Sequence, residues 1–171
     1  MLAIWEEFIS MAEKIFITLG SQKFQFDRLL KAIDELYEKG VLVEEAFAQT
    51  GYSDYEPKHY KFKKFLDRDE FAAEMGKAEI VITHGGTGAI IGAVKKGKKV
   101  IAVPRRAKYG EHVDDHQLQL VRQFRELQLI CECDDTKMLD EALKIVRNTT
   151  YKEYVSNTQK IIDSITDFIE K

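Results

Sequence analysis

The sequence has few residues suited to metal or redox chemistry. Only two of its 171 residues are cysteines, Cys131 and Cys133, and one residue separates them where common zinc-binding pairs have two. In a strand, both side chains would point to the same face. We therefore predict that both are small buried hydrophobic residues in a protein of a reducing compartment.

The sequence also lacks a strong charge excess and any long apolar run. A formal net charge of −3 gives no overall attraction for a polyanion, so no nucleic-acid partner is expected. No run of about 18 apolar residues is present, as a membrane-spanning helix would require. With 44% hydrophobic and 32% charged residues, the composition is that of one folded globular domain.

Residues 1–10 form an apolar leader that carries Leu2, Ile4, Trp5, Phe8 and Ile9. It lacks the basic start and cleavage site of a signal peptide. Either the leader docks on a partner or membrane surface, or it is an appended start, because Met11 is a second plausible initiation site. We place the domain at residues 11–171.

Short apolar segments alternate with amphipathic ones along the rest of the chain. The pattern predicts strands at 15–19, 45–49, 60–66, 79–83, 100–103 and 129–133. It predicts helices from about 26 to a stop at Gly40, at 67–77 capped by Asp67, at 87–96 ended by Gly97, and around 118–127. Two more helices follow, the last carrying Ile161 to Ile169. Such alternation predicts a doubly wound, mostly parallel α/β sheet with helices on both faces.

Ligands of such sheets bind beyond the carboxyl ends of strands. The turn His84-Gly85-Gly86-Thr87-Gly88 stands between a predicted strand and a predicted helix. Glycines let the backbone approach a ligand, and the first amides of a helix suit a diphosphate. A tight turn that binds nothing is the alternative. The turn is not a P-loop, because no Lys-Ser or Lys-Thr pair follows.

Two other loops occupy equivalent positions. Gly20-Ser21-Gln22 follows the first strand, although Ser21 could simply cap a helix. The stretch from Arg105 to Gln117 follows the strand at 100–103, and its Asp114-Asp115 pair suits a helix N-terminus. His112 and His116 lie four residues apart, so a metal site is a less favoured alternative.

Together with Ala48-Gln49-Thr50-Gly51, these loops resemble the C-terminal donor-binding domain of family 28 glycosyltransferases, from about Met11 onward. The most specific part is Gly110-Glu111-His112-Val113-Asp114-Asp115-His116-Gln117 after Pro104-Arg105-Arg106. The sequence is most similar to small soluble subunits of two-part bacterial exopolysaccharide and capsule transferases, and it also resembles the subunit of the eukaryotic dolichol-pathway N-acetylglucosaminyltransferase.

The resemblance implies a Rossmann-like domain of a GT-B enzyme that binds a UDP-sugar, inverts the anomeric centre and needs no metal or other cofactor. Gly20, Ser21 and the glycine turn would hold the diphosphate, with His84 as a further donor. Asp115, His116 and Gln117 would contact sugar hydroxyls, and Arg105 or Arg106 would stabilise the departing UDP. The complete set of expected donor-binding residues is Gly20, Ser21, Gln22, His84, Gly85, Gly86, Thr87, Gly88, Arg105, Glu111, Asp115, His116 and Gln117. A partner is expected to supply the general base, and His116 and Asp115 are the candidates within the chain.

The resemblance further implies a membrane-anchored subunit that binds a lipid-linked sugar acceptor. It would hold this chain at the cytoplasmic face of the membrane. Gly92 departs from the family pattern that the resemblance implies, in which many relatives carry a ribose-binding carboxylate there. Either a backbone contact, Glu111 or Ser21 takes its place, or the donor pocket is looser than usual. A non-catalytic accessory subunit is therefore the alternative function. A sugar-nucleotide epimerase of related fold would need carboxylates and a second domain that the sequence does not offer.

Overall fold

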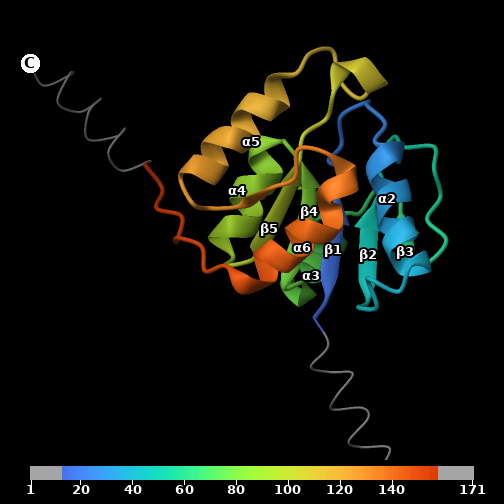
Figure 1. The fold of residues 1–171 in the computed structure, drawn as a ribbon, viewed down its shortest axis with the longest axis horizontal. Coiled ribbons are helices and arrows are strands. Elements are labelled where there is room, and N and C mark those ends of the chain that lie inside the picture. Colours follow the sequence, from blue (N-terminus) through green and yellow to red (C-terminus); the bar gives the residue numbers. More distant parts are fainter. Residues whose placement is uncertain (1–12, 158–171) are drawn as a thin grey trace, which may run out of the picture.

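Six parallel strands form one sheet in the order β3-β2-β1-β4-β5-β6, in a computed structural model that describes residues 13–157 (Figure 1). The leader and the predicted helix carrying Ile161 to Ile169 lie outside these residues. The strands are β1 (Ile15–Thr18), β2 (Ala46–Gln49), β3 (Lys61–Lys63), β4 (Ile80–His84), β5 (Lys99–Val103) and β6 (Cys131–Glu132).

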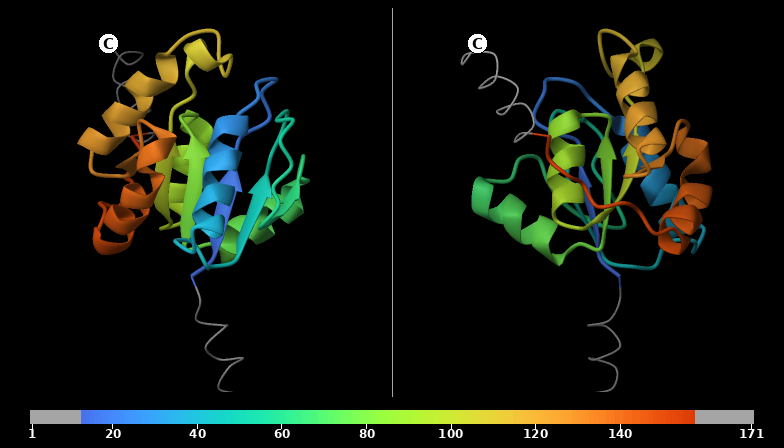
Figure 2. Two further views of the ribbon diagram at one scale, coloured as in Figure 1. Left: turned by 45° about the vertical axis from the view of Figure 1, so that its right-hand side comes forward. Right: turned by 90° about the vertical axis from the view of Figure 1, so that its left-hand side faces the viewer.

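Helices cover both faces of the sheet, which confirms the predicted doubly wound α/β class. They are α2 (Asp27–Glu38), α3 (Arg68–Lys77), α4 (Thr87–Lys95), α5 (His116–Glu126) and α6 (Leu139–Asn148), with the short 3-10 turns η1 (Ala107–Tyr109) and η2 (Thr136–Met138). Figure 2 shows α2 and α6 on one side of the sheet and α3 and α4 on the other. None of the helices within residues 13–157 is long and apolar enough to cross a membrane.

Several local signals act as predicted. Asp67 caps α3, accepting the amide of Glu70 in a capping box, and Gly40 and Gly97 follow the ends of α2 and α4 with positive φ angles of 68° and 70°. A left-handed residue after a helix is the position at which glycine costs least. The start of α3 and the ends of α2 and α4 can therefore be predicted from the local sequence alone.

The two edge strands are shorter than predicted. Strand β3 covers three residues where seven were expected, and β6 covers two where five were expected. At β3, the amide of Leu66 leaves the ladder and donates to the side chain of Gln49. At β6, the amide of Leu129 still donates to Phe124 in the preceding helix. The apolar pattern of these segments reflects burial against helices as well as strand pairing.

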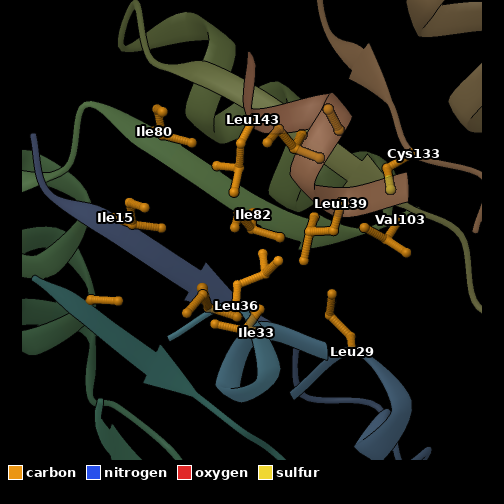
Figure 3. Close-up of a cluster of buried hydrophobic side chains, with 14 of the residues drawn as sticks. Ile15, Leu29, Ile33, Leu36, Ile80, Ile82, Val103, Cys133, Leu139 and Leu143 are labelled. Carbon is orange, nitrogen blue, oxygen red and sulfur yellow. The ribbon is translucent and has the colours of Figure 1, made fainter. Parts of the chain in front are cut away.

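Alternation along the strands separates two cores. Ile15 and Ile17 face α2 and α6, whereas Phe16 packs with residues of α3 and α4. Figure 3 shows the first core, with Cys133 among its aliphatic side chains. Cys131 and Cys133 are both buried there, as predicted, and burial raises the pKa of the Cys133 thiol to about 12. Neither thiol is poised for reaction.

The chain reverses its direction of winding between β1 and β4, which are neighbours in the sheet. From β1 it proceeds to β2 and β3 on one side, and from β4 to β5 and β6 on the other. The Thr83 hydroxyl donates to the Thr18 carbonyl across this junction at 2.9 Å. Beyond these carboxyl ends lies the crevice in which doubly wound sheets bind ligands.

Candidate functional site

A cavity of about 390 Å³ opens at this crevice. It is formed by three loops that are distant in sequence, one after each of β1, β4 and β5. Its lining consists of Gly20, Ser21, Gln22, His84, Gly85, Gly86, Thr87, Gly88, Ala89, His112, His116, Gln117 and Leu120. The structure thus brings together all the predicted donor-binding residues except Arg105, Glu111 and Asp115.

A larger cavity, of about 540 Å³, lies near the amino ends of the strands, between the end of α4 and residues 150–154. The size of a cavity does not identify the binding site in this fold, because doubly wound sheets bind their ligands in the crevice beyond the carboxyl ends of the strands. Of these two cavities, the smaller is lined by the glycine turn and by the first residues of α4 and α5. We therefore take the cavity at the switch point, hereafter the donor cavity, as the candidate site.

His84 lies at the back of the donor cavity with only 8% of its surface exposed. Its Nδ1 accepts the amide of Gly86 at 2.7 Å, and a β-carbon at either Gly20 or Gly86 would collide with the ring. Burial, with a smaller effect from Arg105, lowers the pKa of His84 to about 3. The ring is therefore neutral at pH 7, and because Nδ1 is an acceptor, Nε2 carries the proton.

Gln117 joins the loop after β4 to the loop after β5. Its Oε1 accepts the amides of Gly85 and Arg105, both at 3.1 Å, and the side chain is buried. A β-carbon at Gly85 would lie 2.6 Å from that of Gln117. Gln117 therefore has a structural role, and its contact with a sugar hydroxyl stays a prediction.

The N-terminus of α4 faces the donor cavity. Gly86 is its N-cap and makes no side-chain cap bond, and the first turn holds no acidic residue. The first amides of a helix, here from Thr87 to Ala89, have no acceptor within the helix. Together with the positive end of the helix dipole, they form a site for an anionic group.

Arg105 does not line the cavity, and its guanidinium holds the loop after β1 in place. Its Nη2 donates to the carbonyls of Leu19 at 2.8 Å and Phe24 at 3.1 Å. Its Nε and Nη1 have no hydrogen-bond partner among the described residues. Burial lowers the pKa of the guanidinium to about 10, so it remains charged at pH 7 and adds positive potential behind the cavity.

Glu111 and Asp115 fold the loop between β5 and α5. The fully buried Glu111 carboxylate accepts both Nε (2.8 Å) and Nη2 (3.0 Å) of Arg28, and the amide of Arg106. Asp115 accepts the amide of Ala107 at 2.9 Å. Glu111 is buried and does not line the donor cavity, and its contact with a donor ribose stays a prediction.

The two histidines of this loop take different positions. His116 is exposed at the start of α5 and lines the cavity. His112, which was not predicted as a donor-binding residue, also lines it and packs on Phe24 with ring centroids 4.7 Å apart. Residues 13–157 contain no group of three or more His, Cys, Asp or Glu side chains arranged to hold a metal ion.

Arg28 holds the loop between β5 and α5, and the sequence analysis did not predict this role. It lies in α2 and pairs with Glu111, 83 positions away, and its guanidinium stacks 4.6 Å from the centre of the Tyr109 ring. A charged residue on an amphipathic helix normally faces solvent. Nothing in the local sequence marks it as the anchor of a distant loop.

Comparison with known proteins gives a relative among curated sequences. Over 112 residues, the chain is 30% identical to the UDP-N-acetylglucosamine transferase subunit ALG13 of Yarrowia lipolytica, covering 59% of this chain and 53% of that protein. The aligned region thus spans about half the length of this relative.

Solved structures share the fold. The NMR structure of ALG13 superimposes with a TM-score of 0.57 at 15% identity, covering 90% of this chain and 94% of that one. The calicheamicin glycosyltransferase CalG4 gives 0.58 at 16% identity over 81% of this chain and 36% of its own. MurG of Acinetobacter baumannii gives 0.54 at 18% identity, with 91% and 52% covered. The glycosyltransferase family 28 C-terminal domain matches residues 14–171, and the chain therefore belongs to this family.

Proposed function

We propose that this chain is the donor-binding subunit of an inverting glycosyltransferase. It binds a UDP-sugar in the donor cavity and works with a membrane-anchored partner that holds a lipid-linked sugar acceptor, in bacterial exopolysaccharide or capsule synthesis. The observation that carries the proposal is the meeting of three loops at the switch point of a family 28 domain. That arrangement offers neutral donors and a helix N-terminus to one anionic ligand.

The diphosphate of the donor fits the region between Gly20 and the first turn of α4. There, the Nε2 proton of His84 and the first-turn amides supply hydrogen-bond donors that are in place before reaction. Charge that develops on the departing UDP is stabilised by such preorganised groups. Arg105 contributes from behind, and no metal ion is required in this scheme.

The acceptor hydroxyl must lose a proton during transfer. Within this chain His116 is the better candidate base, because it is exposed at the cavity, whereas one carboxylate oxygen of Asp115 already accepts the Ala107 amide. We propose that the partner otherwise supplies the base. The relative in Yarrowia lipolytica is named as a subunit of a UDP-N-acetylglucosamine transferase, which supports a UDP-sugar donor and a multi-subunit enzyme. Through its partner, this chain would act at the cytoplasmic face of the membrane.

Two measurements test the proposal. Calorimetry with UDP, using CMP as the control nucleotide, should show selective binding to the full chain. The chain and its candidate membrane partner should then transfer sugar from one of several labelled UDP-sugars to a glycolipid, with and without EDTA. Absence of product with every donor, when both proteins are folded, contradicts catalysis, and loss of activity in EDTA contradicts the metal-free scheme.

A non-catalytic accessory subunit is the second candidate, and Gly92 favours it. Gly92 does not line the donor cavity, and it offers no side chain to a ribose. Complete failure to bind millimolar UDP, both alone and assembled with the partner, would favour this function over catalysis.

A further inference from the structure

An exposed aromatic pair stands at the carboxyl end of the β2–β3 edge of the sheet. Tyr52 and Phe65 are 45% and 41% exposed, and their rings meet edge to face with centroids 5.1 Å apart. They come from two different loops, so they form a continuous apolar spot. Aromatic rings of this kind suit the boundary between water and an apolar phase.

A run of basic residues leads along the chain to Phe65, between exposed carboxylates at Asp54 and Glu56 on one side and at Asp67 and Asp69 on the other. The segment from Lys58 to Leu66 contains four lysines and no carboxylate, in a chain whose formal net charge is −3. Lys63 pairs with Glu70 at 2.6 Å. Lys58, Lys61, Lys64 and Arg68 are exposed and form no ion pair with any described residue. The nearby Asp67 carboxylate is already used to cap α3.

This surface adjoins the mouth of the donor cavity. The Gly51 amide donates to the Lys64 carbonyl at 2.8 Å, and a β-carbon at Gly51 would lie 2.9 Å from the Gly20 carbonyl. Gln49 lies between the two regions, since its Oε1 accepts the Leu66 amide and its Nε2 is 3.5 Å from the Gly20 carbonyl. The patch and the cavity therefore share one edge of the sheet.

Lysines on an edge strand often serve only to prevent pairing with another sheet. That role accounts for Lys61 and Lys63, which lie within β3. It does not account for Lys64 and Arg68, which lie beyond the strand, nor for two exposed aromatic rings, which would promote association. The combination of unpaired cations with aromatic rings matches a surface that carries negative charge above an apolar layer.

We propose that Tyr52, Lys64, Phe65 and Arg68, hereafter the rim patch, dock on an anionic lipid surface. The chain itself then contacts the membrane, in addition to any partner subunit. The donor cavity is held beside the lipid surface, where a lipid-linked acceptor would lie. This inference does not depend on donor binding.

Co-sedimentation of the full chain with vesicles tests the rim patch. The chain should bind vesicles containing about 30% phosphatidylglycerol in phosphatidylcholine, bind pure phosphatidylcholine weakly, and be released by 0.5 M NaCl. Since each basic residue near an anionic surface contributes about fivefold in partitioning, the double variant K64E/R68E should bind at least about 25-fold more weakly. Phe65→Ser should weaken binding severalfold without changing its salt dependence.

The matched control is K96E/K152E, which makes the same charge change at two exposed lysines away from the rim patch. It should retain most of the binding. Circular dichroism of each variant checks folding, and a glutamate at position 68 favours the start of α3. Equal binding to neutral and anionic vesicles, equal loss in both double variants, or no vesicle binding at all overturns the proposal. Binding to an acidic partner protein through Lys64 and Arg68, without vesicle binding, also overturns it.

Discussion

At the scale of single residues, His84 contributes to the response of the fold to acid. Its pKa in the folded chain is about 3, against an ordinary value near 6.5 in the unfolded chain. Between these values the unfolded state binds more protons, so stability is lost as the pH falls from about 6.5 towards 3. A neutral His84 also means that the donor cavity keeps the same hydrogen-bond donor throughout the physiological range.

We predict that His84→Gln, which keeps a donor and an acceptor, removes this part of the acid sensitivity. Between pH 7 and pH 5 the unfolding free energy of the wild type should fall by about 2 kcal/mol more than that of the variant. Urea unfolding at both pH values measures the difference. The same loss in both proteins would show that His84 is not the group responsible.

The second prediction at this scale concerns the ion pair between Glu111 and Arg28. Breaking a buried ion pair leaves an uncompensated charge, although Arg28 retains 20% side-chain exposure, which reduces the cost. Glu111→Gln should lower the unfolding free energy by about 2–3 kcal/mol. The exposed control Glu56→Gln should change it by less than about 0.5 kcal/mol. Similar values for both variants would remove the structural role assigned to Glu111.

At the scale of elements, the turn that leads into α4 depends on where each glycine lies. A β-carbon at Gly86 would overlap the His84 ring, whereas one at Gly88 meets nothing within 4 Å. Gly86→Ala should therefore lower the free energy of unfolding by about 1–3 kcal/mol and weaken UDP binding. Gly88→Ala should leave the free energy of unfolding unchanged or raise it by up to about 1 kcal/mol. Denaturant unfolding compares the two, and equal stability would contradict the packing of His84 against Gly86.

Helix α4 also contains Gly92, where an added β-carbon again meets nothing within 4 Å. Gly92→Ala should stabilise the chain by about 0.5–1 kcal/mol, because alanine loses less backbone entropy in a helix. Gly92→Glu introduces the carboxylate that the family resemblance led us to expect here, and it should bind UDP severalfold more tightly than Gly92→Gln. Equal affinity of these two variants would show that a carboxylate here does not reach the ribose.

At the scale of the whole molecule, the donor cavity and the rim patch are adjacent but use different residues. We expect K64E/R68E to bind UDP within about twofold of the wild type, because neither side chain lines the cavity. Gly86→Ala should in turn leave vesicle binding unchanged. Calorimetry and co-sedimentation on the same preparations test this independence, and parallel loss of both activities would contradict it.

Sequence alone determined the alternation of strands and helices, the doubly wound sheet, and the ends marked by Asp67, Gly40 and Gly97. It also identified the three loops that meet at the site. These features depend on periodicity and on hydrogen bonds between near neighbours in the chain. A parallel sheet then places the loops that follow its strands at one edge, whatever the details of packing.

Only the tertiary structure decided which polar side chains reach the cavity. Arg105 binds the Leu19 carbonyl, 86 positions away, and Glu111 binds Arg28 across 83 positions. The sequence motif contains these residues but gives no measure of their burial. The neutral state of His84 likewise depends on its enclosure between Gly20 and Gly86. Burial and long-range pairing are set by how the elements pack, and the local sequence does not encode them.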